Sequence, residues 1–234
     1  MRSPLESLPL FHIGSMPITT AVIVTWGIMA VLAVGGFLFT RRLTSVPSPL
    51  QAALELVVET VDSQIRDTMQ AEPALYRAFI GTLFIFILAA NWSSLVPGIR
   101  PPTAHLETDA ALALLVFLAV IWFGVRENGI GGYLRTFASP SPLMIPLNFV
   151  ENLTRTFSLI VRLFGNVMSG VFVIGIVLSL AGLLVPIPLM ALDLLTGAVQ
   201  AYIFAVLAMV FIAGAIGEGR PAAQENSSIE RASP

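Results

Sequence analysis

A single arginine, Arg162, stands inside a long apolar run, in the stretch SLIVRLFGNVMSG at 158–170. Only small polar side chains follow it until Asp193, so no acid in the same run neutralises it. A charge at the centre of a membrane costs about 2.5–3.5 kcal/mol on insertion scales. Lysine could lose its proton there, whereas arginine, with a pKa above about 12, cannot. A site that must stay positive while nearby groups titrate would therefore use arginine.

Polar side chains recur at steps of three and four around this arginine, so most of them share one helical face. They are Asn148, Glu151, Asn152, Arg155, Ser158, Arg162, Asn166 and Ser169. A later apolar segment repeats the pattern with Asp193, Thr196 and Gln200. Because intramembrane ionisable residues commonly line ion or substrate paths, these residues are candidates for a functional site. The alternative is a structural ion pair of Arg162 with Asp193 or Glu151.

The composition shows why such a charge is exceptional. Of 234 residues, 56% are hydrophobic and 11% are charged, against roughly 25% charged in a soluble domain. An integral membrane protein is therefore predicted. The net charge of −2 gives no indication of nucleic acid as a partner. Cysteine is absent, and His12 and His105 lie far apart, so neither a metal site nor a bound cofactor is expected.

Five apolar segments are long enough to cross a membrane and predict an all-α polytopic fold. They span about 18–39, 79–96, 110–125, 146–182 and 189–216. The stretch 49–72 is apolar on one side only and predicts an amphipathic helix. We expect 18–216 to form one membrane domain, between an N-terminal segment at 1–17 and a disordered polar tail at 217–234.

The arginines predict the orientation of the chain. In a five-span arrangement, Arg41, Arg42, Arg126, Arg135 and Arg220 fall on one side of the membrane, and Arg2 and Arg100 on the other. The positive-inside rule then places the N-terminus outside and the C-terminus in the cytoplasm.

The last two segments are longer than a bilayer requires. The fourth, with about 37 residues, would make about 55 Å of helix against about 30 Å of hydrocarbon. Either both segments are strongly tilted or the fourth breaks near Gly165 or Gly170. A long tilted helical hairpin is the preferred interpretation.

These motifs resemble those of subunit a of the rotary F-type ATP synthases, the stator of the membrane Fo motor. The distinctive residues are RLFGN at 162–166, followed by MSG, and QAYIF at 200–204 across the hairpin. The stretches at 97–114, PGIRPPTAHLETDAALAL, and at 129–134, GIGGYL, are also similar. The resemblance extends from about residue 75 to 216.

The resemblance implies a non-catalytic, ion-translocating subunit of a bacterial inner membrane, with its hairpin facing a ring of c subunits. Each c subunit would carry a buried carboxylate that takes an ion from one half-channel and releases it into a second. Arg162 matches the arginine that holds this carboxylate when it is ionised and prevents leakage. The implied partners are the c ring, b subunits, the other Fo and F1 subunits and lipid. ATP chemistry would belong to other subunits, because the sequence has no P-loop.

Further site residues follow from the same resemblance. Asn166 and Gln200 match polar residues near the arginine, Gln200 as a hydrogen-bond partner of Arg162. Asp193 stands where well-studied bacterial members have a histidine, and Val171 where they have a glutamate. We therefore expect Asp193 to be the acid of the inlet half-channel. Glu151 is a candidate for the exit path, although it lies three residues closer to Arg162 than the acid of many members.

The segment between the second and third spans carries His105, Glu107 and Asp109. In the family this region faces the outer aqueous cavity, so the resemblance implies an inlet funnel. The alternative is a solvated loop and a helix start capped by Thr108 and Asp109. The short N-terminus and the acidic amphipathic segment are similar to the divergent N-ATPase branch, and the transported ion stays open between proton and sodium.

Two other function classes fit the sequence less well. A self-contained secondary ion or solute transporter would be expected to show internal repeats with broken helices, and we find none in the sequence. An intramembrane hydrolase would need a serine–histidine pair, paired aspartates or a metal set within the spans. Only Asp193 lies in a span as an acid with catalytic potential, so the sequence does not supply such a set.

Overall fold

The computed structural model describes residues 9–13, 16–41, 49–96, 99–138, 144–181 and 185–217. Within these ranges the helices are α1 Thr20–Thr40, α2 Pro49–Met69, α3 Pro73–Trp92, α4 Leu106–Ala138, α5 Met144–Ala181 and α6 Pro186–Gly217. Five of them, all except α2, are long and apolar enough to cross a membrane. The predicted all-α polytopic fold is confirmed.

Helix α6 forms the centre of the packing and contacts α2, α3, α4 and α5. Small residues at Gly197, Ala201, Ala205 and Ala208 are buried on it at steps of three and four. Such residues allow helix backbones to approach closely, which is how helices associate where lipid removes the hydrophobic driving force between them.

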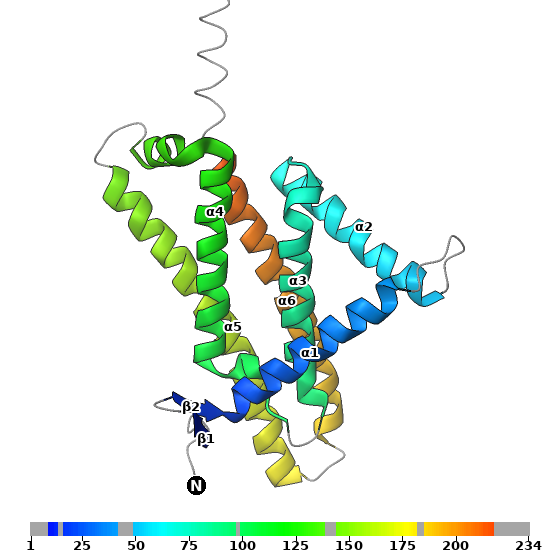
Figure 1. Ribbon diagram of the computed structural model, residues 1–234. Coiled ribbons are helices and arrows are strands. Elements are labelled where there is room, and N and C mark those ends of the chain that lie inside the picture. Colours follow the sequence, from blue (N-terminus) through cyan, green and yellow to red (C-terminus); the bar gives the residue numbers. More distant parts are fainter. Residues whose placement is uncertain are drawn as a thin grey trace, which may run out of the picture.

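Helices α5 and α6 form an antiparallel hairpin inclined to the upright α3 and α4 (Figure 1). Helix α5 is continuous over 38 residues and passes through Gly165 and Gly170 without a break. At 1.5 Å per residue it is about 57 Å long. Of the two interpretations of its length, the structure therefore has the tilted hairpin.

Helix α4 turns sharply at Gly129, where φ is 71° and ψ is 165°. This left-handed conformation is readily available to glycine. Beyond the turn, Tyr133 folds back so closely that a Cβ on Gly124 would lie 2.6 Å from its ring. Asn128 Nδ2 donates to Ala215 O at 3.1 Å, which binds the turn to the end of α6. The third span, expected at about 110–125, thus continues as a longer helix with a bend at Gly129.

Helix α3 begins at Pro73, against the 79 expected from hydropathy, and so includes Arg77. Arg77 donates through Nε and Nη2 to the two carboxylate oxygens of Asp62 on α2, both at 2.5 Å. Next to this pair Ile65 is fully buried. The second half of the amphipathic helix α2 is therefore bound to the bundle.

Strands β1, Pro9–Ile13, and β2, Met16–Thr19, pair in an antiparallel hairpin before α1. The sequence did not predict these strands within the N-terminal segment 1–17. Helix α1 crosses the bundle obliquely (Figure 1) and only 6% of its apolar window is buried. The tail expected at 217–234 lies outside the described residues from 218 onward.

A short 3₁₀-helix, η1 Ser93–Leu95, follows α3, and a second, η2 Pro102–Ala104, precedes α4. Pro102 and Thr103 of η2 are buried, and η2 contacts α1, α3, α4 and α5. We call this end of the bundle, where α3 ends and α4 and α6 begin, the η2 end.

Candidate functional site

Arg162 lies at the midpoint of α5 on the exposed side of the helix. Its neighbours Leu159 and Leu163 are buried in the core, at 2% and 0% exposure, and anchor the opposite face. Within the described ranges, the Arg162 side chain has no hydrogen bond or ion pair. The arrangement presents a permanent positive charge outward from the middle of a membrane helix.

The whole outward face of α5 is open. Only 11% of the apolar window of α5 is buried within the chain, against 44% for α6. Exposed residues at Phe157, Val161 and Val173 surround the polar side chains. A helix that carries a charge and this much uncovered surface is suited to a protein partner.

Glu151, one candidate partner of Arg162, is bound to another residue. It forms an ion pair with Arg155 one turn along α5, and the Arg155 guanidinium lies over the Phe211 ring of α6 at 5.4 Å. These residues border an open groove of about 590 Å³ between α5 and α6, which we call the Glu151 groove. Its lining consists of Leu147, Val150, Glu151, Thr154, Arg155, Ser158, Leu159, Arg162, Leu207 and Phe211.

Asp193, the other candidate partner, lies against α5 at Gly170. A Cβ built on Gly170 would stand 2.0 Å from Asp193 Oδ1, so this close approach requires glycine. The Asp193 carboxyl also interacts with the side chain of Ser94, which follows α3. Neither acid pairs with Arg162 in the described part of the chain, so the structure does not support the alternative of a structural ion pair.

The two polar residues expected near the arginine have different environments. Gln200 on α6 is 6% exposed, and its donor Nε2 has no acceptor among the described residues. The expected hydrogen bond from the Arg162 guanidinium to the Gln200 side chain is not formed in the described part of the chain. Asn166 is partly buried, and its backbone oxygen accepts a hydrogen bond from Ser169 Oγ at 2.8 Å. A buried amide donor without a partner costs free energy, so Gln200 is available to bind another group.

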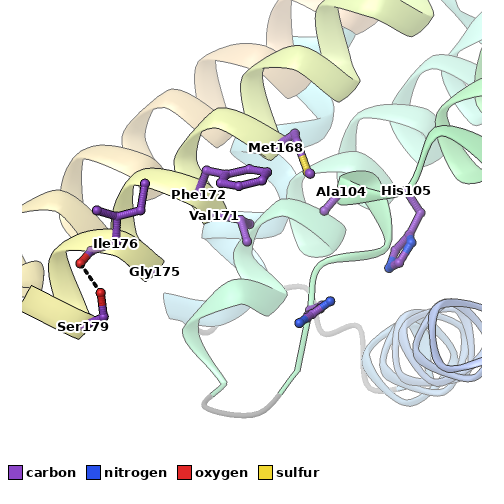
Figure 2. Close-up of a pocket in the computed structure, with 9 residues that line it drawn as sticks. Ala104, His105, Met168, Val171, Phe172, Gly175, Ile176 and Ser179 are labelled. Carbon is purple, nitrogen blue, oxygen red and sulfur yellow. Dashed lines mark hydrogen bonds between the residues drawn. The ribbon is translucent and has the colours of Figure 1, made fainter. Parts of the chain in front are cut away.

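A second hollow, of about 320 Å³, lies on α5 on the other side of Arg162, at the η2 end. We call it the His105 hollow. Figure 2 shows His105 and Ala104 on one wall, facing side chains of α5 from Met168 to Ser179. The full lining is Arg100, Ala104, His105, Met168, Val171, Phe172, Gly175, Ile176 and Ser179. The pKa of His105 is lowered, first by burial and then by the nearby Arg100, while Glu107 opposes the shift.

The three residues expected to form an inlet funnel have different environments. His105 lines the hollow, Glu107 is exposed, and Asp109 is fully buried at 0% exposure. Both carboxyl oxygens of Asp109 are without a hydrogen-bond partner among the described residues. The alternative role of Asp109 as a helix cap is therefore not supported either.

The sequence did not single out Asn91 and Trp92, which bind the candidate region of α6, or Thr103, which binds Asn91. Asn91 Nδ2 donates to Gly197 O at 2.8 Å, and Trp92 Nε1 donates to Leu194 O at 3.1 Å. Thr103 Oγ1 donates to Asn91 Oδ1 at 2.7 Å. In the sequence these residues stand out only as polar side chains near the end of an apolar span. Such residues are also found wherever a helix leaves the membrane, so the pattern does not indicate a functional role.

The fold and site define a multi-pass membrane protein with an arginine on an open helical face between two hollows, unpaired within the described ranges. Comparison with known proteins identifies the family of this chain. Residues 22–213 match the family model described as ATP synthase A chain. The chain therefore belongs to the ATP synthase subunit a family.

Individual relatives match over almost their full length. The chain is 55% identical to ATP synthase subunit a 2 of Bradyrhizobium sp. strain BTAi1 over 215 residues, which cover 92% of this chain and 96% of that protein. It is 43% identical to ATP synthase subunit a of Albidiferax ferrireducens over 223 residues, 94% of this chain and 96% of that protein. A subunit a 2 from Pelobacter propionicus is 47% identical over 207 residues, 88% and 91% of the two chains.

Proposed function

We propose that this chain is the ion-translocating stator of a rotary ATP synthase, and that Arg162 separates two half-channels facing a ring of c subunits. The observation that carries this proposal is the position of Arg162 on one continuous helix, between the Glu151 groove and the His105 hollow. Its side chain is exposed and has no partner among the residues that the structure describes. A carboxylate on a partner would supply the missing counter-charge.

The half-channels are assigned from the two hollows. The His105 hollow lies at the η2 end, so it would be the inlet. Asp193 lies against Gly170, the residue before Val171 of the hollow's lining, and would be the acid that passes ions to the ring. The Glu151 groove begins at the opposite end of α5 and reaches Arg162, so it would be the exit path. Asn166, Ser169 and Gln200 would line the path near the arginine.

The proposed orientation places the η2 end and the N-terminus outside and the C-terminus in the cytoplasm of a bacterial inner membrane. In this proposal the chain is non-catalytic and ATP is made or hydrolysed on F1 subunits. Further partners would be b subunits and the other Fo subunits. Proton and sodium stay as alternative ions, and membership of the N-ATPase branch stays a prediction. Family membership argues against a self-contained transporter or a hydrolase.

The proposal is tested with Arg162→Ala in the complete complex, in inverted membrane vesicles, by following ATP-driven acidification or sodium uptake. We expect loss of coupled transport with the complex still assembled. The matched control is Arg66→Ala, which removes an exposed arginine of α2 outside both hollows. Normal pumping by Arg162→Ala would refute the proposal.

The role of Asp193 needs its own test. We expect Asp193→Asn to reduce ion flux and to abolish part of its pH dependence, because the amide cannot carry a proton in place of the carboxyl. Flux with an unaltered pH dependence would remove Asp193 from the inlet.

A further inference from the structure

The end of α3 makes two hydrogen bonds to backbone carbonyls of α6. Asn91 donates to Gly197 O and Trp92 donates to Leu194 O, at 2.8 and 3.1 Å. Carbonyls within a helix already accept a hydrogen bond from the amide four residues later. The two side chains therefore use the second lone pair of each carbonyl, which binds α3 to α6 without interrupting either helix.

Asn91 is itself fixed from the opposite side. Thr103 Oγ1 donates to Asn91 Oδ1 at 2.7 Å, and the two residues are 0% and 5% exposed. Because Gly197 O can only accept, the amide nitrogen of Asn91 must point to α6 and its oxygen to the Thr103 hydroxyl, which then donates. A Cβ on Gly197 would lie 3.0 Å from the Asn91 Cβ, so Asn91 fits against α6 at a glycine.

The stretch of α6 that includes Leu194 and Gly197 also contacts α5. Asp193 lies against Gly170, and its carboxyl also interacts with Ser94, just beyond α3. Residues 193–200 therefore lie between fixed contacts to two helices. A slip of one residue along a helix moves a side chain by about 1.5 Å and turns it by about 100°, which would take Asp193 or Gln200 away from its place.

We propose that Asn91, Trp92 and Thr103 are positioning residues that set the register of α6 against α5. They act through α6, by placing Asp193 and Gln200 relative to Arg162. The consequence for transport rests on the proposed function, whereas the register is a property of the fold that can be measured without transport.

The register is measured by the distance between two spin labels in the complete complex. The chain has no cysteine, so Leu180→Cys on α5 and Leu195→Cys on α6, both exposed at 81% and 62%, would be the labelled positions. We expect Trp92→Phe and Asn91→Leu to shift or broaden the distance distribution. The control is Trp122→Phe on α4, because Trp122 is exposed and donates no hydrogen bond to a described residue. An unchanged distance in both variants would overturn the proposal.

The effect on transport is read from ATP-driven pumping as a function of pH. A displacement of about 1 Å in a site can cost up to roughly 100-fold in rate, so we expect Asn91→Leu to reduce pumping about tenfold and to shift its pH profile. Thr103→Val should act in the same direction and Thr103→Ser, which keeps the hydroxyl, should restore the profile. A shifted distance with an unchanged pH profile would overturn the positioning role.

Failure of this inference can be told from failure of the proposed function. Arg162→Ala should stop pumping while leaving the distance between the labels unchanged. Normal pumping in that variant would refute the stator role, whereas an unchanged distance in both Trp92→Phe and Asn91→Leu refutes the register.

Discussion

Asp193 of α6 lies so close to Gly170 of α5 that a Cβ on the glycine would stand 2.0 Å from the carboxyl oxygen Oδ1. Real Cβ contacts are not this short, so any other residue at this position must displace the carboxyl group. The contact makes the backbone of one hairpin helix part of the environment of an acid on the other.

Gly170→Ala is therefore expected to rotate Asp193 out of place and to lower ATP-driven pumping, with little change in melting temperature. The displaced atom is the end of a short side chain, so the helices need not separate. The control is Gly214→Ala on α6, where a Cβ meets nothing within 4 Å. If displacement of Asp193 is the cause, adding Asp193→Asn to Gly170→Ala should produce no further loss; an additive loss would contradict this explanation.

Asp109→Asn is expected to raise the melting temperature of the purified complex. Asp109 is fully buried and its oxygens have no partner among the described residues, and a buried carboxyl is more costly than a neutral amide of the same shape. The exposed Glu107 provides the matched control, since Glu107→Gln should leave the melting temperature unchanged. A fall in melting temperature for Asp109→Asn would indicate that the carboxyl has a partner from another subunit.

His105 is expected to titrate below the ordinary histidine value of about 6.5, because burial and Arg100 lower its pKa. NMR of the imidazole would measure it, and His12→Gln leaves His105 as the remaining histidine of the chain. Arg100→Gln should raise this pKa and Glu107→Gln should lower it further. The control Glu127→Gln, at a distant exposed position, should leave the pKa unchanged.

The sign of the resulting effect on stability follows from linkage. A lowered pKa means that the unfolded chain binds the proton more readily than the folded chain, so stability rises with pH through this window. The contribution of His105 is fully present above about pH 6.5 and declines as the pH falls below it. His105→Gln should remove that part of the pH dependence of unfolding.

Asp62→Asn is expected to lower the melting temperature more than Glu151→Gln does. Asp62 is almost buried and accepts two hydrogen bonds from Arg77, which join α2 to α3. Glu151 pairs with Arg155 on one exposed helical face, and pairs of that kind contribute little. Equal melting temperatures for the two variants would show that the contact between α2 and α3 does not depend on the ion pair.

Hydropathy predicted the membrane helices because long apolar runs are a local property of the sequence. It missed the start of α3, since Arg77 ended the apolar run although its charge is paired with Asp62 fifteen residues earlier. The third span was expected to end at 125, and nothing local indicated that Tyr133 and Asn128 beyond it pack back against the bundle.

The candidate site, like the fold, could be predicted only where it depends on local sequence. Arg162 was identifiable from its own run of residues, and its exposed place on α5 needs no distant contact. The environments of Asp193, Asp109 and Gln200 depend on which helices meet, which the spacing within one helix does not specify. Asn91 and Thr103 went unnoticed because their chemistry is a contact with the backbone of α6.

The open face of α5 also has a consequence for how the protein is made in the cell. A lone copy would hold Arg162 in the bilayer without a counter-charge, at a cost of about 2.5–3.5 kcal/mol on insertion scales, while only 11% of the apolar window of that helix is buried within its own chain. Such a helix is held only weakly against the rest of its own chain. It is therefore accessible to the proteases that remove incompletely folded membrane proteins. Newly made copies should therefore be short-lived until an acidic partner covers α5, which would match the amount of this chain to the supply of that partner.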